Sequence, residues 1–214
     1  MADIGAPSGY RYADASPTAA HTYLVPAVRG VLASLSLSSG DRRIFDLGCG
    51  NGAVAAVLAR EGYEITGIDA SAEGIAQARQ AHPELKLFEG SAYDDLAAKF
   101  GTFPVVLSLE VVEHLYDPRR FASRLHALVE PGGTAIVSAP YHGYLKDLAL
   151  AISGRMDAHF TALWDHGHIK FWSVRTLRVL LGEAGFEPIT FLRIGRIPSL
   201  AKAMIAVARK PDSR

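Results

Sequence analysis

The chain has 214 residues, which suits one domain, residues 1–214, with a sizeable core. Its 22 lysines and arginines balance 22 aspartates and glutamates, so no net positive field attracts nucleic acid, and we exclude it as a partner. With one cysteine, no secretory signal pattern and no apolar run long enough to cross a membrane, the sequence predicts a cytoplasmic protein without disulfides.

The first 40 residues are predicted to form an arm followed by a helix. Residues 1–16 mix glycine, proline, serine and alanine with tyrosines, a composition typical of an irregular segment. Apolar residues then recur at helical spacing from about Thr18 to Leu32, and the serine-rich stretch before Gly40 ends the helix.

A glycine-rich turn follows the first predicted strand. Residues 44–47 are an apolar run with one carboxylate, and Gly48, Gly50 and Gly52 follow before helical spacing resumes at Val54. Glycine tolerates positive φ and lets the backbone approach a ligand closely. The G-x-G-x-G spacing differs from the G-x-G-x-x-G that binds a dinucleotide pyrophosphate.

The second predicted strand, residues 64–68, ends in a carboxylate. Asp69 therefore stands at the carboxyl end of a strand, one strand–helix–strand unit after the glycine turn. A carboxylate in this position can accept hydrogen bonds from both hydroxyls of a ribose. The two features together predict a ligand of adenosine type that lacks a pyrophosphate.

Residues 45–52, which read F-D-L-G-C-G-N-G, and residues 67–69, which read G-I-D, resemble the class I S-adenosylmethionine (SAM)-dependent methyltransferase family. The resemblance implies an α/β fold, a Rossmann-like sheet of seven mostly parallel strands with helices on both faces, the last strand antiparallel, and a lid inserted after strand five. It also implies a cofactor site. The loop would pass under the methionine moiety, Asp46 would help to fix the amino group, and Asp69 would bind the ribose. The expected cofactor-binding residues are Tyr12, Asp46, Gly48, Cys49, Gly50, Asn51, Gly52, Asp69, Ala70, Ser91, Ala92 and Glu110.

Two of these assignments leave alternatives open. The family commonly has an aspartate that contacts the adenine at the position where this chain has Ser91, so we expect Ser91 to be a weaker acceptor assisted by the backbone of Ala92. Family members often lay their leading arm over the cofactor, which suggests that Tyr12 lines the site. Packing of Tyr12 on the domain surface is an equally good interpretation.

The remaining elements follow in regular order. A helix capped by Ser71 precedes short strands at residues 85–88 and 104–109, and Asp117 with Pro118 opens the next helix. A fifth strand is predicted at residues 134–138, a helix capped by Ser173 follows, and residues 186–192 and 203–209 are the last two strands.

The sequence after the fourth strand reads E-V-V-E-H, in which Glu110, Glu113 and His114 carry the polar groups. It resembles the branch of the family that methylates oxygen in ubiquinone biosynthesis, in which such a cluster has been associated with a divalent ion. We favour the interpretation without a metal, in which Glu110 points into the crevice while Glu113 and His114 cap the loop and the next helix.

Residues 141–172 are unusually rich in aromatic and imidazole groups, with a short helix predicted at residues 145–152. A segment that rises from the carboxyl end of strand five would overhang the ligand crevice, so we interpret it as an acceptor lid. Methyl transfer to an alcohol, phenol or ammonium group requires a proton acceptor, and His142, His166 and His168 are the candidate catalytic residues.

We therefore predict an enzyme that transfers a methyl group from SAM to a small-molecule acceptor, at oxygen or nitrogen. A SAM-binding sensor or assembly partner without catalysis is the alternative from another class. An NAD-dependent dehydrogenase is disfavoured by the glycine spacing. The identity of the acceptor and the oligomeric state are not encoded in any motif that we find.

Overall fold

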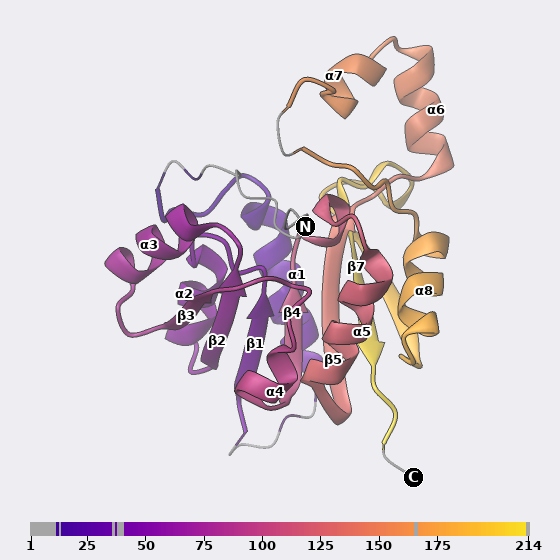
Figure 1. Cartoon of the computed structure of the whole chain (residues 1–214). Coiled ribbons are helices and arrows are strands. Elements are labelled where there is room, and N and C mark those ends of the chain that lie inside the picture. The colour runs from indigo at the N-terminus through magenta and orange to yellow at the C-terminus, as the bar shows by residue number, and fades with distance from the viewer. Residues whose placement is uncertain (1–11, 13, 36, 38–40, 165–166, 213–214) are drawn as a thin grey trace, which may run out of the picture.

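The computed structural model describes residues 12, 14–35, 37, 41–164 and 167–212 (Figure 1). Its α-helices are α1 (His21–Ser34), α2 (Ala53–Arg60), α3 (Ala72–Ala81), α4 (Leu96–Phe100), α5 (Pro118–Leu128), α6 (Tyr144–Ile152), α7 (Met156–Phe160) and α8 (Val174–Glu183). Two short 3-10 helices are η1 (Val112–His114) and η2 (Pro198–Leu200). The strands are β1 (Arg43–Leu47), β2 (Glu64–Asp69), β3 (Lys86–Glu89), β4 (Phe103–Ser108), β5 (Val129–Pro140), β6 (Ile189–Ile194) and β7 (Ala203–Arg209).

The strands form one seven-stranded sheet in the order β3-β2-β1-β4-β5-β7-β6. The five strands from β3 to β5 pair in parallel, and β7 is antiparallel to both β5 and β6. The predicted fold class is therefore confirmed, including the antiparallel last strand. The chain order of strands reverses between β1 and β4, and a ligand crevice is expected at such a point of an open α/β sheet.

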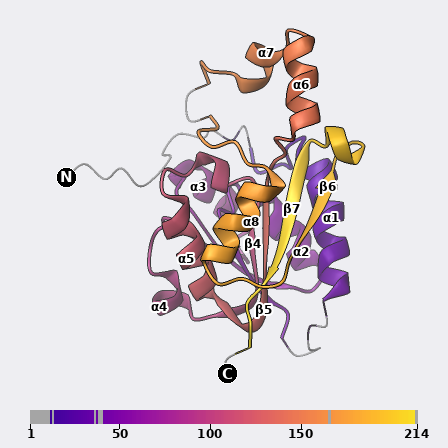
Figure 2. The same cartoon turned by 90° about the vertical axis from the view of Figure 1, so that its right-hand side faces the viewer.

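Helices cover both faces of the sheet (Figure 2). One core cluster packs Phe45, Phe121 and Leu177 together, and the other packs Leu24, Ile44 and Leu58. All six side chains are fully buried. Burial on both faces explains the continuous apolar run of β4, because each face of a central parallel strand meets a helix layer.

The predicted helix caps are confirmed. The side chains of Ser71, Asp117 and Ser173 each accept a hydrogen bond from a backbone N–H in the first turn of α3, α5 and α8. Helices α4 and α7 were not predicted, since a five-residue helix is too short to show a clear apolar period.

Helices α6 and α7 project from the body beyond the end of the sheet at which the parallel strands finish (Figures 1 and 2). None of the residues of these two helices is buried. The helix predicted at residues 145–152 is thus present as α6. Within the described ranges, no helix combines the length and the hydropathy needed to cross a bilayer.

Candidate active site

A cavity of about 310 Å³ lies where the glycine turn, the ends of β1, β2 and β4, the start of α1 and the 141–172 segment meet. Its lining includes nine of the predicted site residues: Tyr12, Asp46, Gly48, Cys49, Gly50, Asn51, Asp69, Glu110 and His168. His21, His114 and Trp164 also line it. The size suits a small molecule, which a few polar groups can orient among apolar walls.

The glycine turn has the backbone conformation that the sequence predicts. Gly48, Gly50 and Gly52 have φ values of 94°, 54° and 75°, in the left-handed region that side chains disfavour. A Cβ at Gly50 would collide with the ring of Tyr12. The N–H groups of Gly48 and Cys49 both donate to the carbonyl oxygen of Ile68, at 2.8 and 2.9 Å, and this holds the turn against β2.

Asp69 is anchored by two backbone groups and faces the cavity. Its Oδ2 accepts the N–H of Gly50 and its Oδ1 accepts the N–H of Ser71, both at 2.8 Å. Burial raises the pKa of this carboxyl, while the two backbone bonds oppose the rise. Each carboxylate oxygen has two lone pairs, so each can accept one further hydrogen bond.

Asp46 is a buried acid with a perturbed pKa. Burial, and then the nearby charge of Asp69, raise the pKa of Asp46 to about 7. Cys49 is also buried, and burial raises the pKa of its thiol well above the ordinary value, so it packs as a neutral side chain. A cationic group bound in the cavity would stabilise ionised Asp46, because an opposite charge favours the charged form.

The N-terminal segment covers the glycine turn. The Nδ2 of Asn51 donates to the carbonyl oxygens of Asp14 and Ser16, at 2.7 and 3.1 Å. The Nε2 of Gln77 donates to the carbonyl oxygen of Tyr12 at 2.9 Å. These bonds place the ring of Tyr12 next to Gly50, at the edge of the cavity.

Glu110 has an unusual backbone conformation and a fixed side chain. Its φ of 55° is rare for a residue other than glycine, and such conformations concentrate at functional sites. The hydroxyl of Ser138 donates to Glu110 Oε1 at 2.7 Å and accepts the N–H of Glu110 at 2.9 Å. Burial raises the pKa of Glu110 to about 7, and the bond from Ser138 opposes this rise.

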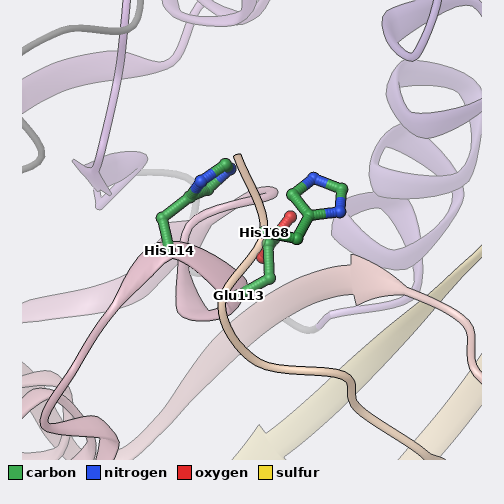
Figure 3. A group of neighbouring side chains, drawn as sticks. All are labelled: Glu113, His114 and His168. Atoms are coloured by element: carbon green, nitrogen blue, oxygen red, sulfur yellow. The ribbon is translucent and has the colours of Figure 1, made fainter. Parts of the chain in front are cut away.

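Glu113 and His114, which the sequence places together, form a cluster with His168, which the sequence did not place beside them (Figure 3). One ligand atom from each lies within 4.8 Å of the others. Glu113 is fully buried, and neither of its carboxylate oxygens has a hydrogen-bond partner in the described part of the chain. Burial, and then the charge of Glu110, raise its pKa well above the ordinary value. The prediction that Glu113 caps a loop or helix is therefore wrong, and Asp117 caps α5.

The cluster fits a divalent cation chemically. Burial, and then neighbouring histidines, lower the pKa of His168 to about 4, so its imidazole is neutral and able to ligate. The Nδ1 of His114 lies 3.2 Å from the carbonyl oxygen of Gly167. A carbonyl only accepts, so Nδ1 carries the proton and Nε2 is the nitrogen left to ligate. A carboxylate with two imidazoles is a common donor set for transition metals.

The other predicted site residues that the structure describes lie outside the cavity lining. His142 packs against Phe160 and Phe171, and its Nδ1 lies 3.8 Å from Asp147 Oδ1. Burial is the largest cause that lowers the pKa of His142 to about 4. Gly52 precedes α2, Ala70 follows β2, and Ser91 and Ala92 lie in the turn after β3. His166 lies outside the described residues. The catalytic role of the histidines stays a prediction.

Comparisons with known proteins agree with this geometry. A family model described as a methyltransferase domain matches residues 21–190. The ubiquinone biosynthesis O-methyltransferase of Ruegeria pomeroyi is 36% identical over 69% of this chain and 60% of its own length. Its counterpart in Azorhizobium caulinodans is 37% identical over 68% of this chain and 58% of its own length. The chain thus spans less than two thirds of these curated relatives.

Solved structures share the fold at lower sequence identity. The magnesium protoporphyrin IX methyltransferase of Synechocystis PCC 6803, solved with bound S-adenosylhomocysteine (SAH), is 21% identical, with a TM-score of 0.65 over 87% of this chain and 82% of its own. The [4+2]-cyclase SpnF is 18% identical, with a TM-score of 0.67 over 96% of this chain and 88% of its own. These likenesses concern architecture alone, because one fold can support different reactions.

Proposed function

Since the chain belongs to the SAM-dependent methyltransferase family, we propose that it transfers the methyl group of SAM to an oxygen atom of a small-molecule acceptor. The observation that carries this proposal is the cavity in which the glycine turn, Asp46 and Asp69 face the residues of η1 and the 141–172 segment. The names of the O-methyltransferase relatives support oxygen over nitrogen as the methylated atom.

The chain's own residues account for cofactor binding. The carboxylate of Asp69 accepts bonds from the two ribose hydroxyls through the lone pairs that the backbone leaves. The glycine turn lets the backbone lie close under the methionine moiety. The ammonium group of that moiety balances the charge of buried Asp46, whose ionisation is otherwise disfavoured by burial.

The transfer itself needs positioning more than acid catalysis. The acceptor oxygen forms a bond to the methyl carbon as the carbon–sulfur bond breaks, and neutral SAH leaves without being protonated. Holding acceptor, methyl carbon and sulfur in line in a closed cavity can contribute up to about 7 to 11 kcal/mol. Tyr12 and Trp164 line the cavity, and a bound acceptor would displace water from it.

The proton of the acceptor hydroxyl must be taken up by a side chain in the cavity. Glu110 suits this role, because Ser138 fixes its carboxylate and its pKa of about 7 matches proton uptake near neutral pH. Glu113, His114 and His168 are the residues that would hold a divalent cation. Such a cation, when bound, polarises the acceptor oxygen as a Lewis acid.

Calorimetry with SAM and SAH tests the cofactor assignment. Incubation with methyl-labelled SAM and a panel of phenols, catechols and amines tests the acceptor class. We expect both cofactor forms to bind and label to enter a hydroxyl-bearing acceptor. Binding of NADH without SAM would refute the proposal. Binding of SAM with no labelled product from a cell extract, together with a copurifying protein, would instead support the non-catalytic alternative.

A further inference from the structure

Helix α3 carries a buried glycine in its first turn. Gly74 is the third residue of α3, and its N–H donates to the Oγ of Ser71, which caps the helix. Glycine destabilises a helix relative to alanine, so the local structure gives no reason for a glycine here. Within the part of the chain that the structure describes, no residue of α3 lines the cavity. A reason for Gly74 must therefore come from a tertiary contact.

The tertiary contact at Gly74 is with the ring of Tyr12. A Cβ added at Gly74 would lie 3.0 Å from Cε2 and 3.1 Å from Cδ2 of this ring, closer than packed carbon atoms normally approach. It would also lie 3.1 Å from the carbonyl oxygen of Gly50. A Cβ at Gly50 would itself collide with the ring of Tyr12. Two glycines from different elements thus leave the space that one aromatic side chain occupies.

Helix α3 also holds the backbone of Tyr12. Gln77 lies three residues after Gly74, so the two residues share one face of the helix. The Nε2 of Gln77 donates to the carbonyl oxygen of Tyr12 at 2.9 Å, across 65 residues of sequence. One face of α3 therefore contacts both the ring and the backbone of the same tyrosine.

The position of Tyr12 bears on the carboxylate of Asp69. The N–H of Gly50 donates to Asp69 Oδ2, and the ring of Tyr12 packs next to this same glycine. Tyr12, Gly50 and Asp69 all line the cavity. The ring therefore forms part of the cavity wall close to a group that holds the carboxylate.

We propose that Gly74 and Gln77 are positioning residues for the cofactor: Gly74 leaves room for the ring of Tyr12, and Gln77 fixes its backbone, so that the ring borders the bound adenosyl group. Both residues act through Tyr12 and lie outside the cavity lining. A side chain that is already in place when the ligand arrives loses less conformational freedom on binding. This inference rests on the proposed function, which assigns the cavity to SAM.

A double-mutant cycle between Gly74→Ala and Tyr12→Ala tests the inference, with the affinity of the full chain for SAH measured by calorimetry. We expect Gly74→Ala to weaken SAH binding by about three- to tenfold when Tyr12 is present. In the Tyr12→Ala background it should change the affinity by less than about twofold, because the ring that the new Cβ displaces is gone. Tyr12→Phe keeps the ring, so the effect of Gly74→Ala should return in that background.

Gln77→Ala gives an independent second cycle. It removes the bond to the carbonyl oxygen of Tyr12 without adding an atom near the glycine turn. Its effect on SAH affinity should also be about three- to tenfold with Tyr12 present and less than about twofold in Tyr12→Ala. If Gly74→Ala does not fold, the cycle with Gln77→Ala decides the question.

Two matched controls separate this effect from general changes in the helices. Gly182→Ala adds a Cβ within α8, where no atom lies within 4 Å of it. Gln80→Ala removes the same type of side chain as Gln77→Ala, from an exposed position of α3. Both should leave the affinity for SAH unchanged, and a cooperative thermal transition shows that each variant is folded.

An unchanged affinity in folded Gly74→Ala and Gln77→Ala would overturn the inference. An equal loss with and without the Tyr12 ring would also overturn it, because Gly74 would then act through the carbonyl of Gly50 instead. A wild type that binds SAH without coupling between these positions retains the proposed function and refutes the inference. A wild type that does not bind SAH refutes the proposed function, and the inference with it.

Discussion

Replacing Asp69 with alanine should remove the ribose contacts and weaken SAM binding strongly. Each Asp69 oxygen already accepts one backbone N–H at 2.8 Å, which leaves one lone pair for each ribose hydroxyl. A hydrogen bond to a charged group contributes about 1.5 to 3 kcal/mol, so losing two costs about 3 to 6 kcal/mol, or roughly 10² to 10⁴-fold in affinity. The thermal midpoint should also fall by several degrees, because the N–H groups of Gly50 and Ser71 lose their acceptor.

Calorimetry with SAH measures the affinity, and circular dichroism confirms that the variant is folded. Asp117→Ala is the matched control, since Asp117 also accepts a backbone N–H at a helix start, from Arg120 at 3.0 Å, but it does not line the cavity. It should lose about 0.5 to 2 kcal/mol of stability without losing affinity for SAH. If folded Asp69→Ala binds SAH as tightly as the wild type, the assignment of Asp69 to the ribose is refuted.

Three further outcomes are expected. Burial raises the pKa of Asp46 from 3.8 to about 7, so between these pH values the folded chain binds a proton that the unfolded chain does not. The ligand-free wild type therefore loses stability as the pH rises from about 4 to about 7. Asp46→Asn lacks this titration, so its thermal midpoint should fall less between pH 5 and pH 7.5 than that of the wild type. Gly50→Ala should lower the free energy of unfolding by about 1 to 2 kcal/mol, because the φ of 54° at this position disfavours a side chain. It should also weaken SAH binding, because the new Cβ displaces Tyr12, and an unchanged affinity for SAH in calorimetry would contradict this. Phe121→Ala should cost about 3 to 5 kcal/mol in urea unfolding while the folded variant keeps its affinity for SAH, since Phe121 is fully buried outside the cavity lining.

Local patterns predicted most of the fold because they reflect local physical constraints. The continuous apolar run of β4 predicted a central parallel strand, and the capping side chains at Ser71 and Asp117 marked where helices begin. Two parts were not predicted. Helices α4 and α7 are too short to show an apolar period. Strand β5 was predicted at residues 134–138 but begins at Val129, because its pairing with β4 continues past a shift in register.

The residues on the cofactor side of the candidate site could also be predicted from the sequence. Gly48, Gly50 and Asp69 are brought together by the strand–turn–helix unit and one neighbouring strand, so their spacing along the chain determines their geometry. The acceptor side was predicted less well. His142, which looked well placed after β5, packs among aromatic side chains, whereas His114 reaches the cavity.

The sequence alone thus determined the sheet, the caps and the glycine turn with its two acids, because short-range sterics and apolar periodicity fix them. Only the tertiary structure decided which distant polar groups meet. Glu113 and His114 meet His168 because two backbone N–H groups of the 141–172 segment bond to η1, a contact that no sequence spacing encodes. Whether a buried carboxylate has a partner depends on such long-range contacts, and for that reason the place of His168 beside Glu113 and His114 became visible in the folded chain alone.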